Sequence, residues 1–268
     1  MAQNAANEFS KKLSNVILEG NLTPEQVYNL DETGINFKLL PDRMLATPQE
    51  TTAAGFKTNK ERITVAFCTN AAGSHKLPLF VIGKSAKPRA FKNININALP
   101  VYYKAQKSVW MNSFLFEEWF FFLLTHLKLP LKALLLDNVP SHRINLSTGD
   151  IKVIFLPPAV TSLVQPMDQG VIISLKRRYR KKLLTEILEI HNQETGLMEA
   201  LKKINIKDVI YMLASAFEEM PLSTFVKSWR KLWPDVEKLT GQSNLEKKPC
   251  AEDLTDHSNI ALLNDFNP

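Results

Sequence analysis

The stretch that decides the fold is Leu134-Leu135-Leu136-Asp137-Asn138, a short apolar run that ends in a carboxylate and is soon followed by Pro140. A run too short for a helix and stopped in this way is typical of a buried central strand. An isolated carboxylate is costly to bury, so Asp137 should lie at a solvated strand end or beside a compensating cation such as a metal. Asp137 is therefore the first candidate functional residue.

Two further acids stand next to regular segments. Asp31 follows the alternating residues 27–30 and is expected to close a strand, with Gly34 separating it from a second short strand at 35–40. Asp168, followed by a Gln and a Gly, is expected to open a long helix that runs to about residue 190. The sequence thus places three acids at the ends of elements.

The remaining pattern supplies the order of the elements. We expect helices at 7–19, 113–127, 206–219 and 222–232, strands at 62–70, 77–82, 102–103, 132–137 and 151–156, a hairpin turn at 71–74 and a basic loop at 84–100. The central order, strand, hairpin, helix, strand, strand, helix, is that of a ribonuclease H-like α/β fold with a mixed sheet flanked by helices. In that fold the first strand lies beside the strand of Asp137, so Asp31 and Asp137 should be neighbours.

The fold class also suggests a division of the chain. We expect a helical lead-in at 1–25, a ribonuclease H-like domain at 26–192, a C-terminal helical extension at 193–238 and a disordered acidic tail at 239–268. The 268 residues carry a net charge of +6, but residues 240–268 alone carry −3, so the rest of the chain carries +9. A basic body favours a polyanionic partner, either nucleic acid or an acidic protein.

Other classes of protein are disfavoured by the composition. The start of the chain lacks the apolar core of a secretory signal, and the longest apolar run, 119–124, is far too short to span a bilayer. We therefore expect no membrane partner. The two cysteines give neither a disulfide framework nor a zinc-binding spacing, so a reducing compartment is expected.

Three carboxylates brought together would favour a hard divalent cation. Mg²⁺ or Mn²⁺ takes oxygen ligands, and a two-metal centre can activate a water or a 3′-hydroxyl for phosphoryl transfer. Each acid also has a structural explanation, because residues 31–34 are suited to a turn and Asp168 is a suitable helix N-cap. Composition and spacing leave the metal site and these structural roles both open.

Several blocks of sequence are distinctive beyond their charge and periodicity. They are Asn29-Leu30-Asp31-Glu32-Thr33-Gly34, residues 76–85, Leu134-Leu135-Leu136-Asp137-Asn138 with Pro140-Ser141-His142, residues 155–170, and Ser228-Trp229-Arg230-Lys231-Leu232-Trp233-Pro234. In this order, across roughly residues 5–235, they resemble the DDE-type transposase domain of the pogo and Tigger elements, which the host relatives jerky and centromere protein B share.

The resemblance implies roles for particular residues. Asp31, Asp137 and Asp168 fall on the three catalytic, metal-binding acids of that family, with Mg²⁺ or Mn²⁺ as cofactor. Four neighbours, Asn138, His142, Gln165 and Gln169, fall beside those acids and are expected either to shape the site or to serve as turn, cap and packing residues. The partner implied is DNA and the compartment is the nucleus. A homodimer is left open.

A basic segment in the long expected helix is the candidate DNA contact. Its residues are Lys176, Arg177, Arg178, Arg180 and Lys181, with Lys182 beside them. Six cations in seven positions cannot all lie on one helix face, so an ordinary solvated helix surface and a sequence-independent phosphate track are both open. A nuclear localisation signal is a weaker alternative.

Two functions follow from these features. The first is a transposon-derived DDE endonuclease that cleaves DNA and transfers strands. The second is a host-adopted nuclear DNA-binding protein that keeps the fold without the reaction. The intact acids favour the first. The sequence starts just before the first strand, without the helix-turn-helix modules with which full-length members of the family begin, which favours the second or a fragment.

Overall fold

The computed structural model describes residues 2–39, 61–126, 132–142, 151–158, 160–191 and 197–241. Its strands are β1 (Val27–Asn36), β2 (Arg62–Asn70), β3 (Phe80–Gly83), β4 (Tyr102–Ala105), β5 (Ala133–Leu136) and β6 (Lys152–Phe155). Its α-helices are α1 (Ala2–Glu19), α2 (Ser113–His126), α3 (Thr161–Val164), α4 (Val171–His191), α5 (Leu197–Lys203), α6 (Ile206–Glu218), α7 (Leu222–Ser228) and α8 (Val236–Leu239). Short 3₁₀ turns are η1 (Arg89–Phe91), η2 (Ile96–Ala98), η3 (Pro140–His142) and η4 (Pro166–Asp168).

The six strands form one mixed sheet in the order β4-β3-β2-β1-β5-β6. β1 pairs antiparallel with β2 and parallel with β5, and β5 pairs parallel with β6. The short outer strand β4 pairs parallel with β3. This is the ribonuclease H-like α/β arrangement that the sequence predicts, and the expected pairing of the first strand with the strand before Asp137 is confirmed.

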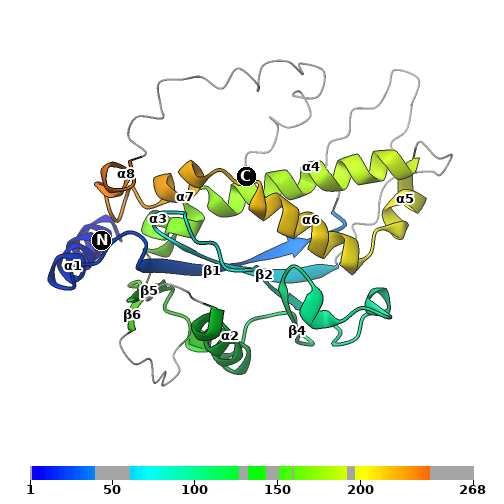
Figure 1. Ribbon diagram of the computed structural model, residues 1–268, viewed down its shortest axis with the longest axis horizontal. Helices are drawn as coiled ribbons and strands as arrows, with labels where there is room; N and C mark the ends of the chain where they lie inside the picture. Colours follow the sequence, from blue (N-terminus) through cyan, green and yellow to red (C-terminus); the bar gives the residue numbers. More distant parts are fainter. Residues whose placement is uncertain are drawn as a thin grey trace, which may run out of the picture.

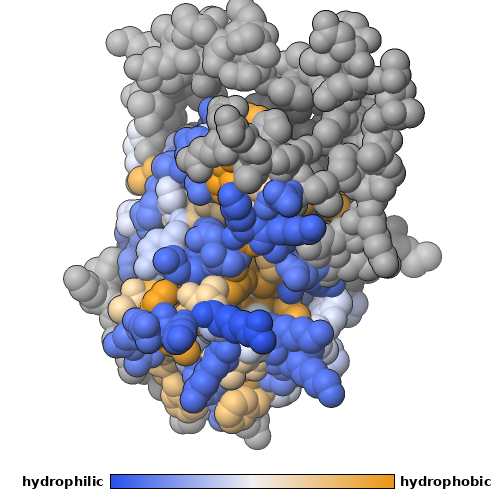
Figure 2. Space-filling view, turned by 90° about the vertical axis from the view of Figure 1, so that its right-hand side faces the viewer, coloured by the Kyte–Doolittle hydropathy of each residue, from blue (hydrophilic) through white to orange (hydrophobic). Residues whose placement is uncertain are grey.

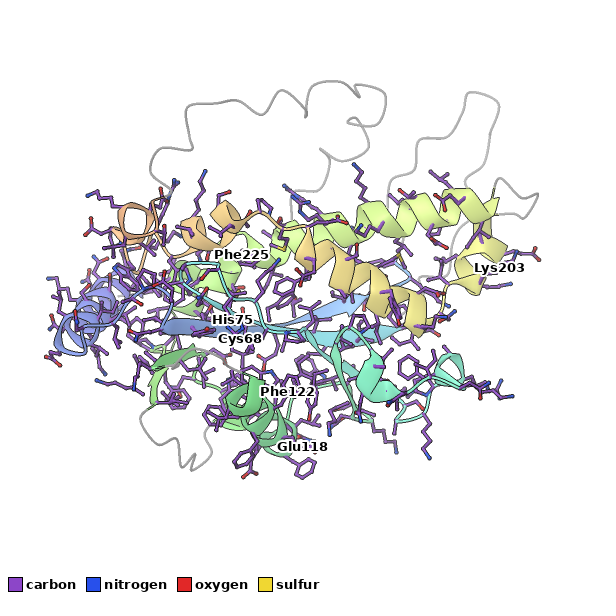
Figure 3. The ribbon with its side chains drawn as sticks, in the orientation of Figure 1. Cys68, His75, Glu118, Phe122, Lys203 and Phe225 are labelled. Carbon is purple, nitrogen blue, oxygen red and sulfur yellow. The ribbon has the colours of Figure 1, made fainter. Side chains whose placement is uncertain are left out.

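Helices cover both faces of the sheet (Figure 1). On one face α4 and α6 pack with α7 onto β2, where Phe67 contacts the rings of Phe217 and, through it, Phe225. On the other face α2 places Phe116 and Trp119 in one buried cluster with Leu134 and Leu136 of β5. In Figure 3, Phe225 and Phe122 lie on opposite sides of the sheet. Burial of these faces follows from the apolar runs of the strands.

The end of the sheet at β5 and β6 is closed by the two ends of the described chain. Phe9 and Leu13 of α1 share a buried cluster with Trp229, just after α7, and with Leu135 of β5. The hydroxyl of Ser10 donates to the backbone oxygen of Leu232 at 3.2 Å. The N-terminal helix and the C-terminal helices therefore pack together on the sheet, while the division of the chain into domains stays a prediction.

Two expectations about the acids need correction. Asp31 does not close a strand, because β1 continues without interruption to Asn36 and remains paired with β2 along its whole second half. Gly34 therefore lies within β1 and does not separate two strands. Asp168 does not begin the long helix either: it closes η4, and α4 starts at Val171 after Gly170, whose φ is +98°.

Other differences concern surface segments. The basic loop at 84–100 contains η1 and η2, the last expected helix ends at Ser228, and α5 is not predicted by the sequence. The acidic tail beyond 241 lies outside the described residues. Within the part of the chain that the structure describes, no helix is both long and apolar enough to cross a bilayer.

Candidate metal centre

The three predicted acids are carried by β1, β5 and η4. Asn29 of β1 pairs with Leu135 of β5, so the same parallel register continued by two residues sets Asp31 opposite Asp137. The two carboxylates come from adjacent strands. Their neighbourhood is a direct result of the sheet topology.

A buried asparagine ties the third acid to the other two. Asn29 is fully buried, and its Nδ2 donates to the Leu135 backbone oxygen at 3.1 Å. Its Oδ1 accepts from the Met167 backbone N–H at 3.1 Å, one residue before Asp168. One side chain therefore connects β1, β5 and η4. Because buried amide groups are costly to leave unpaired, this connection fixes the three elements relative to one another.

Asp168 interacts electrostatically with both of the other acids. Asp31 is only 8% exposed, and burial, together with the charges of Asp168 and Glu32, raises its pKa to about 8. The pKa of Asp168 is also raised, first by desolvation of its carboxylate and also by the charge of Asp137. Asp168 and Asp31 lie close enough to share a hydrogen bond when one of them is protonated. This bond opposes the rise in the pKa of Asp168 but does not cancel it. The site thus holds excess negative charge in a poorly solvated place.

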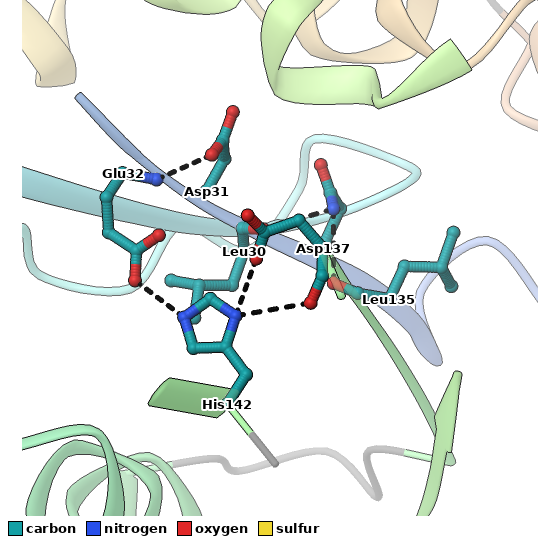
Figure 4. Close-up of polar contacts among 7 residues, drawn as sticks. Leu30, Asp31, Glu32, Leu135, Asp137 and His142 are labelled. Atoms are coloured by element: carbon teal, nitrogen blue, oxygen red, sulfur yellow. Dashed lines mark hydrogen bonds and ion pairs between the residues drawn. The ribbon is translucent and has the colours of Figure 1, made fainter. Parts of the chain in front are cut away.

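A second cluster lies on the other side of β1 (Figure 4). His142 is fully buried, and its Nε2 lies 2.9 Å from Glu32 Oε1 while its Nδ1 lies 2.6 Å from Asp137 Oδ1. Its ring packs on Phe116 of α2, with 4.5 Å between ring centroids. Burial disfavours the imidazolium, but hydrogen bonds to Asp137 and Glu32 outweigh burial and raise the pKa of His142 to about 10. His142 is therefore a cation at neutral pH.

Glu32 is the site residue that the sequence does not indicate. It follows Asp31 directly, and successive residues of a strand point to opposite faces, so Glu32 is directed away from Asp168 and toward His142. The sequence of residues 31–34 also suits a turn, and side chains alternate between the two faces only where the strand is continuous. Glu32 is therefore not recognisable as a site residue from the sequence alone. For His142 the sequence leaves two roles open, one in the site and one in a turn. In the structure it bridges two acids, Glu32 and Asp137.

Two glutamines flank the third acid differently. Gln165 is fully buried against Asp31, where it favours the ionised carboxylate, yet neither of its amide atoms has a well-formed hydrogen bond among the described residues. Gln169 instead donates from Nε2 to the Ser162 backbone oxygen at 3.2 Å, which is a packing role. Gln165 is thus the glutamine whose polar atoms belong to the site.

Two groups of ligand atoms are available to a cation. Within the described residues, Glu32, Asp137 and His142 offer atoms that all lie within 4.8 Å of one another. His142 is held protonated between its two acids, and a protonated imidazole cannot ligate a metal. Asp31, Asp137 and Asp168 offer carboxylate oxygens alone, which is the donor chemistry that Mg²⁺ or Mn²⁺ prefers, and the raised pKa values of Asp31 and Asp168 indicate excess negative charge although Asp137 is paired with His142. The residues present fit a hard divalent cation.

The cations of the basic segment of α4 lie on different faces of the helix. Lys176 is half-buried, and its pKa is lowered first by burial and then by the charges of Arg180 and Arg62, while Asp168 and Asp31 oppose the change. Lys182 instead forms an ion pair with Glu219 at 2.7 Å. Lys176 and Arg180, one turn apart, therefore lie on the side of the acids, whereas Lys182 faces α6. Arg177 and Lys181 are exposed, and Arg178 is partly buried.

Removing the buried cation should destabilise the fold. His142→Phe keeps a ring beside Phe116 but leaves Glu32 and Asp137 uncompensated, so we expect a loss of about 3 kcal/mol in the free energy of unfolding at pH 6.5. A group whose folded-state pKa is raised stabilises fully below its unfolded pKa, and this contribution disappears as pH rises through about 10. The loss should therefore be smaller at pH 10, as measured by urea unfolding.

A second substitution provides the control for that prediction. Glu32→Gln added to His142→Phe removes one uncompensated carboxylate and should recover part of the lost stability. No recovery, or an equal loss at pH 6.5 and pH 10, would contradict the charge bridge.

Comparison with known proteins places the chain in a family. The profile of the DDE superfamily endonuclease family matches residues 60–229. The chain is 36% identical over 256 residues to the human Jerky protein homolog, covering 91% of this chain and 43% of that protein. It is 38% identical over 248 residues to human Tigger transposable element-derived protein 7, covering 84% and 45% respectively. The chain thus spans less than half the length of these relatives.

A solved structure supports the fold independently. The Mos1 transposase paired-end complex with left transposon end superposes with a TM-score of 0.53 at 13% sequence identity, covering 90% of this chain and 61% of that one. At this identity the likeness concerns the fold, and it agrees with the ribonuclease H-like sheet described above.

Proposed function

The chain belongs to the DDE superfamily endonucleases, and from this premise we propose that it is a transposase-derived domain that cleaves and joins DNA strands with divalent metal ions. The observation that supports the proposal is the proximity of Asp31, Asp137 and Asp168, because the raised pKa values of Asp31 and Asp168 indicate negative charge that a cation would relieve. Mg²⁺ or Mn²⁺ at these oxygens would supply Lewis-acid activation of a nucleophile and stabilise the leaving oxygen.

The chain's own residues would prepare the site. Asn29 fixes the relative positions of the strands and of η4, and His142 holds the Asp137 carboxylate in one orientation through its Nδ1. Asp31 itself is almost completely buried, so its carboxylate is poorly solvated. Such preorganisation matters because a metal ligand displaced by a fraction of an ångström loses affinity and orientation.

The test of the reaction is nicking of supercoiled plasmid DNA. The proposal expects the wild-type protein to convert supercoiled to open-circular DNA with Mg²⁺ or Mn²⁺ and to stop when EDTA is added. A protein that binds DNA but yields no nicked product with either metal would contradict the enzymatic function.

DNA would approach along the basic side of α4. Lys and Arg side chains near phosphates displace counterions and give affinity that does not depend on sequence. Figure 2 shows the end of the molecule at which α5 and the C-terminal part of α4 lie, and hydrophilic side chains cover much of its described surface. Nearer the acids, Lys176 and Arg180 of α4 supply the positive charge that suits a polyanionic backbone.

Neutralising the acid-facing cations should weaken DNA binding. The double variant Lys176→Gln Arg180→Gln should reduce the slope of log K against log salt concentration by about two and lower affinity at low salt. Fluorescence anisotropy of labelled duplex over a range of salt concentrations measures both. Lys182→Gln is the matched control on the same helix, because Lys182 is already paired with Glu219. Equal effects of the two variants would contradict the division of the helix by face.

One observation favours a second function, a nuclear DNA-binding protein that keeps the fold without the reaction. The Asp137 carboxylate is paired with a cationic His142, so this acid is partly neutralised without any metal. Under this alternative the protein binds DNA in the salt-dependent way described above and shows no nicking with either metal. Under both functions we propose a nuclear location, and self-association into a homodimer is open to sedimentation analysis.

A further inference from the structure

Trp110 differs from the other three tryptophans of the chain. Trp119, Trp229 and Trp233 are buried, whereas Trp110 is 59% exposed. A large aromatic side chain left open in this way is informative when its surroundings are basic and ordered. Trp110 lies just before α2, in the segment that follows β4.

The backbone that presents Trp110 is strained and held firmly. Val109 has φ +62°, a conformation that β-branched residues rarely adopt. Thr64 of β2 donates from its hydroxyl to the Val109 backbone oxygen at 2.6 Å, and the Gln106 side chain accepts from the Val109 N–H at 3.1 Å. Strain of this kind costs roughly 1–3 kcal/mol and persists only where the surrounding contacts impose it. These contacts fix the position of the exposed indole.

Arg62 of β2 lies beneath this indole. Its Cζ is 4.3 Å from the centroid of the Trp110 ring, and its guanidinium crosses Gly34 of β1 so closely that a Cβ there would overlap it. The Arg62 Nε is buried and has no hydrogen-bond partner among the described residues. Gly34 thus makes room for the Arg62 side chain beneath the indole.

The pair lies beside the metal centre. Gly34 is three residues beyond Asp31 on the same strand, about 10 Å along it, and it lies on the face of β1 that carries Glu32. The charge of Arg62 also helps to lower the pKa of Lys176, which faces the acids from α4. Trp110, Arg62 and Lys176 therefore combine an open aromatic face with cations at the edge of the site.

From this arrangement we propose that Trp110 and Arg62 bind one unpaired nucleotide of the DNA strand that enters the metal centre. The indole stacks on the base and the guanidinium contacts the phosphate, which is how proteins hold single-stranded segments without reading their sequence. The inference rests on the proposed function, because it takes DNA as the substrate. Duplex that keeps its bases paired gains nothing from the platform, so the pair favours DNA with an opened end.

The fluorescence of Trp110 provides the test, since it is the exposed tryptophan among four. The probes are a short blunt duplex and the same duplex with a single-stranded 3′ extension, in buffer containing Ca²⁺ to limit cleavage. The extended duplex should quench the tryptophan emission and protect it from acrylamide. Trp110→Ala should lose this response and bind the extended duplex about tenfold more weakly, with little change for the blunt duplex.

Two variants guard against indirect effects. Trp110→Phe keeps a stacking face and should restore most of the affinity, whereas Tyr211→Ala, which removes a 49% exposed aromatic ring from α6, should leave it unchanged. Unchanged affinity of Trp110→Ala for the extended duplex, in a protein whose wild type nicks DNA, overturns the nucleotide site and leaves the proposed function intact. A wild type that binds neither probe overturns both. If Trp110→Ala weakens binding of the blunt duplex as much as binding of the extended duplex, the stacking role is overturned.

Discussion

Replacing Asp137 with Asn should lower metal-dependent nicking of DNA by more than about 100-fold. Asp137 lies where β5 ends, opposite Asp31 on the neighbouring strand, and its charge acts on Asp168. Loss of an outer-shell partner of a metal ligand already costs about 10–100-fold, so loss of a direct ligand charge should exceed that range. The measurement is the initial rate of open-circular product from supercoiled plasmid with Mn²⁺ and with Mg²⁺.

The control for this substitution is Asp235→Asn, because Asp235 forms only an exposed ion pair with Lys238. It should nick DNA at the wild-type rate. Nicking by Asp137→Asn within a few-fold of wild type would exclude a catalytic role for Asp137 and indicate that a contaminating nuclease or another site performs the reaction.

The second large effect concerns stability in the absence of metal. Burial and the nearby charges of Asp168 and Glu32 raise the pKa of Asp31 to about 8. A carboxyl whose pKa is higher in the folded state than in the unfolded state destabilises the fold as pH rises from about 4 through about 8. With EDTA present, wild type should therefore be less stable at pH 8.5 than at pH 5, and Asp31→Asn should lose much of this dependence.

Adding metal should reverse the difference. A cation bound by the folded state at about 100 times its Kd stabilises by about 2.7 kcal/mol, so Mn²⁺ should raise the melting temperature of wild type at pH 8.5. Asp31→Asn should melt above wild type in EDTA and respond little to Mn²⁺. An equal response of wild type and Asp31→Asn would place the ion elsewhere, and a wild type more stable at pH 8.5 than at pH 5 in EDTA would contradict the charge repulsion.

The pairing of Asp31 with Asp137 could be predicted because it depends on topology alone. Once the element order indicates a ribonuclease H-like sheet, the first strand must lie beside the strand of residues 133–136. The fold class was therefore accessible from apolar runs and turn residues. Asp168 was a candidate from its position before a long helix, and the family resemblance then assigned it to the same site as the other two acids.

The contact between Glu32 and His142 depends on tertiary structure and could not be predicted from the sequence. Glu32 reaches His142 because β1 is continuous through Gly34, and the sequence around Gly34 is equally suited to a turn. A glycine is needed at position 34 because the Arg62 side chain crosses it and leaves no room for a Cβ. The two residues are 28 positions apart, so the local sequence around Gly34 does not reveal this contact. The division of the basic helix is different: Lys176 and Arg180 are four residues apart, so helical periodicity alone could have separated them from Lys182.

Whether Asp31, Asp137 and Asp168 together bind the divalent ion can be decided by locating the ion. A crystal of the protein soaked in Mn²⁺ and measured for anomalous scattering would show where manganese binds. We predict a peak among the carboxylates of Asp31, Asp137 and Asp168, with the contact between His142 and Asp137 intact. A peak confined to Glu32, Asp137 and His142, or no peak near any of the three acids, would contradict it.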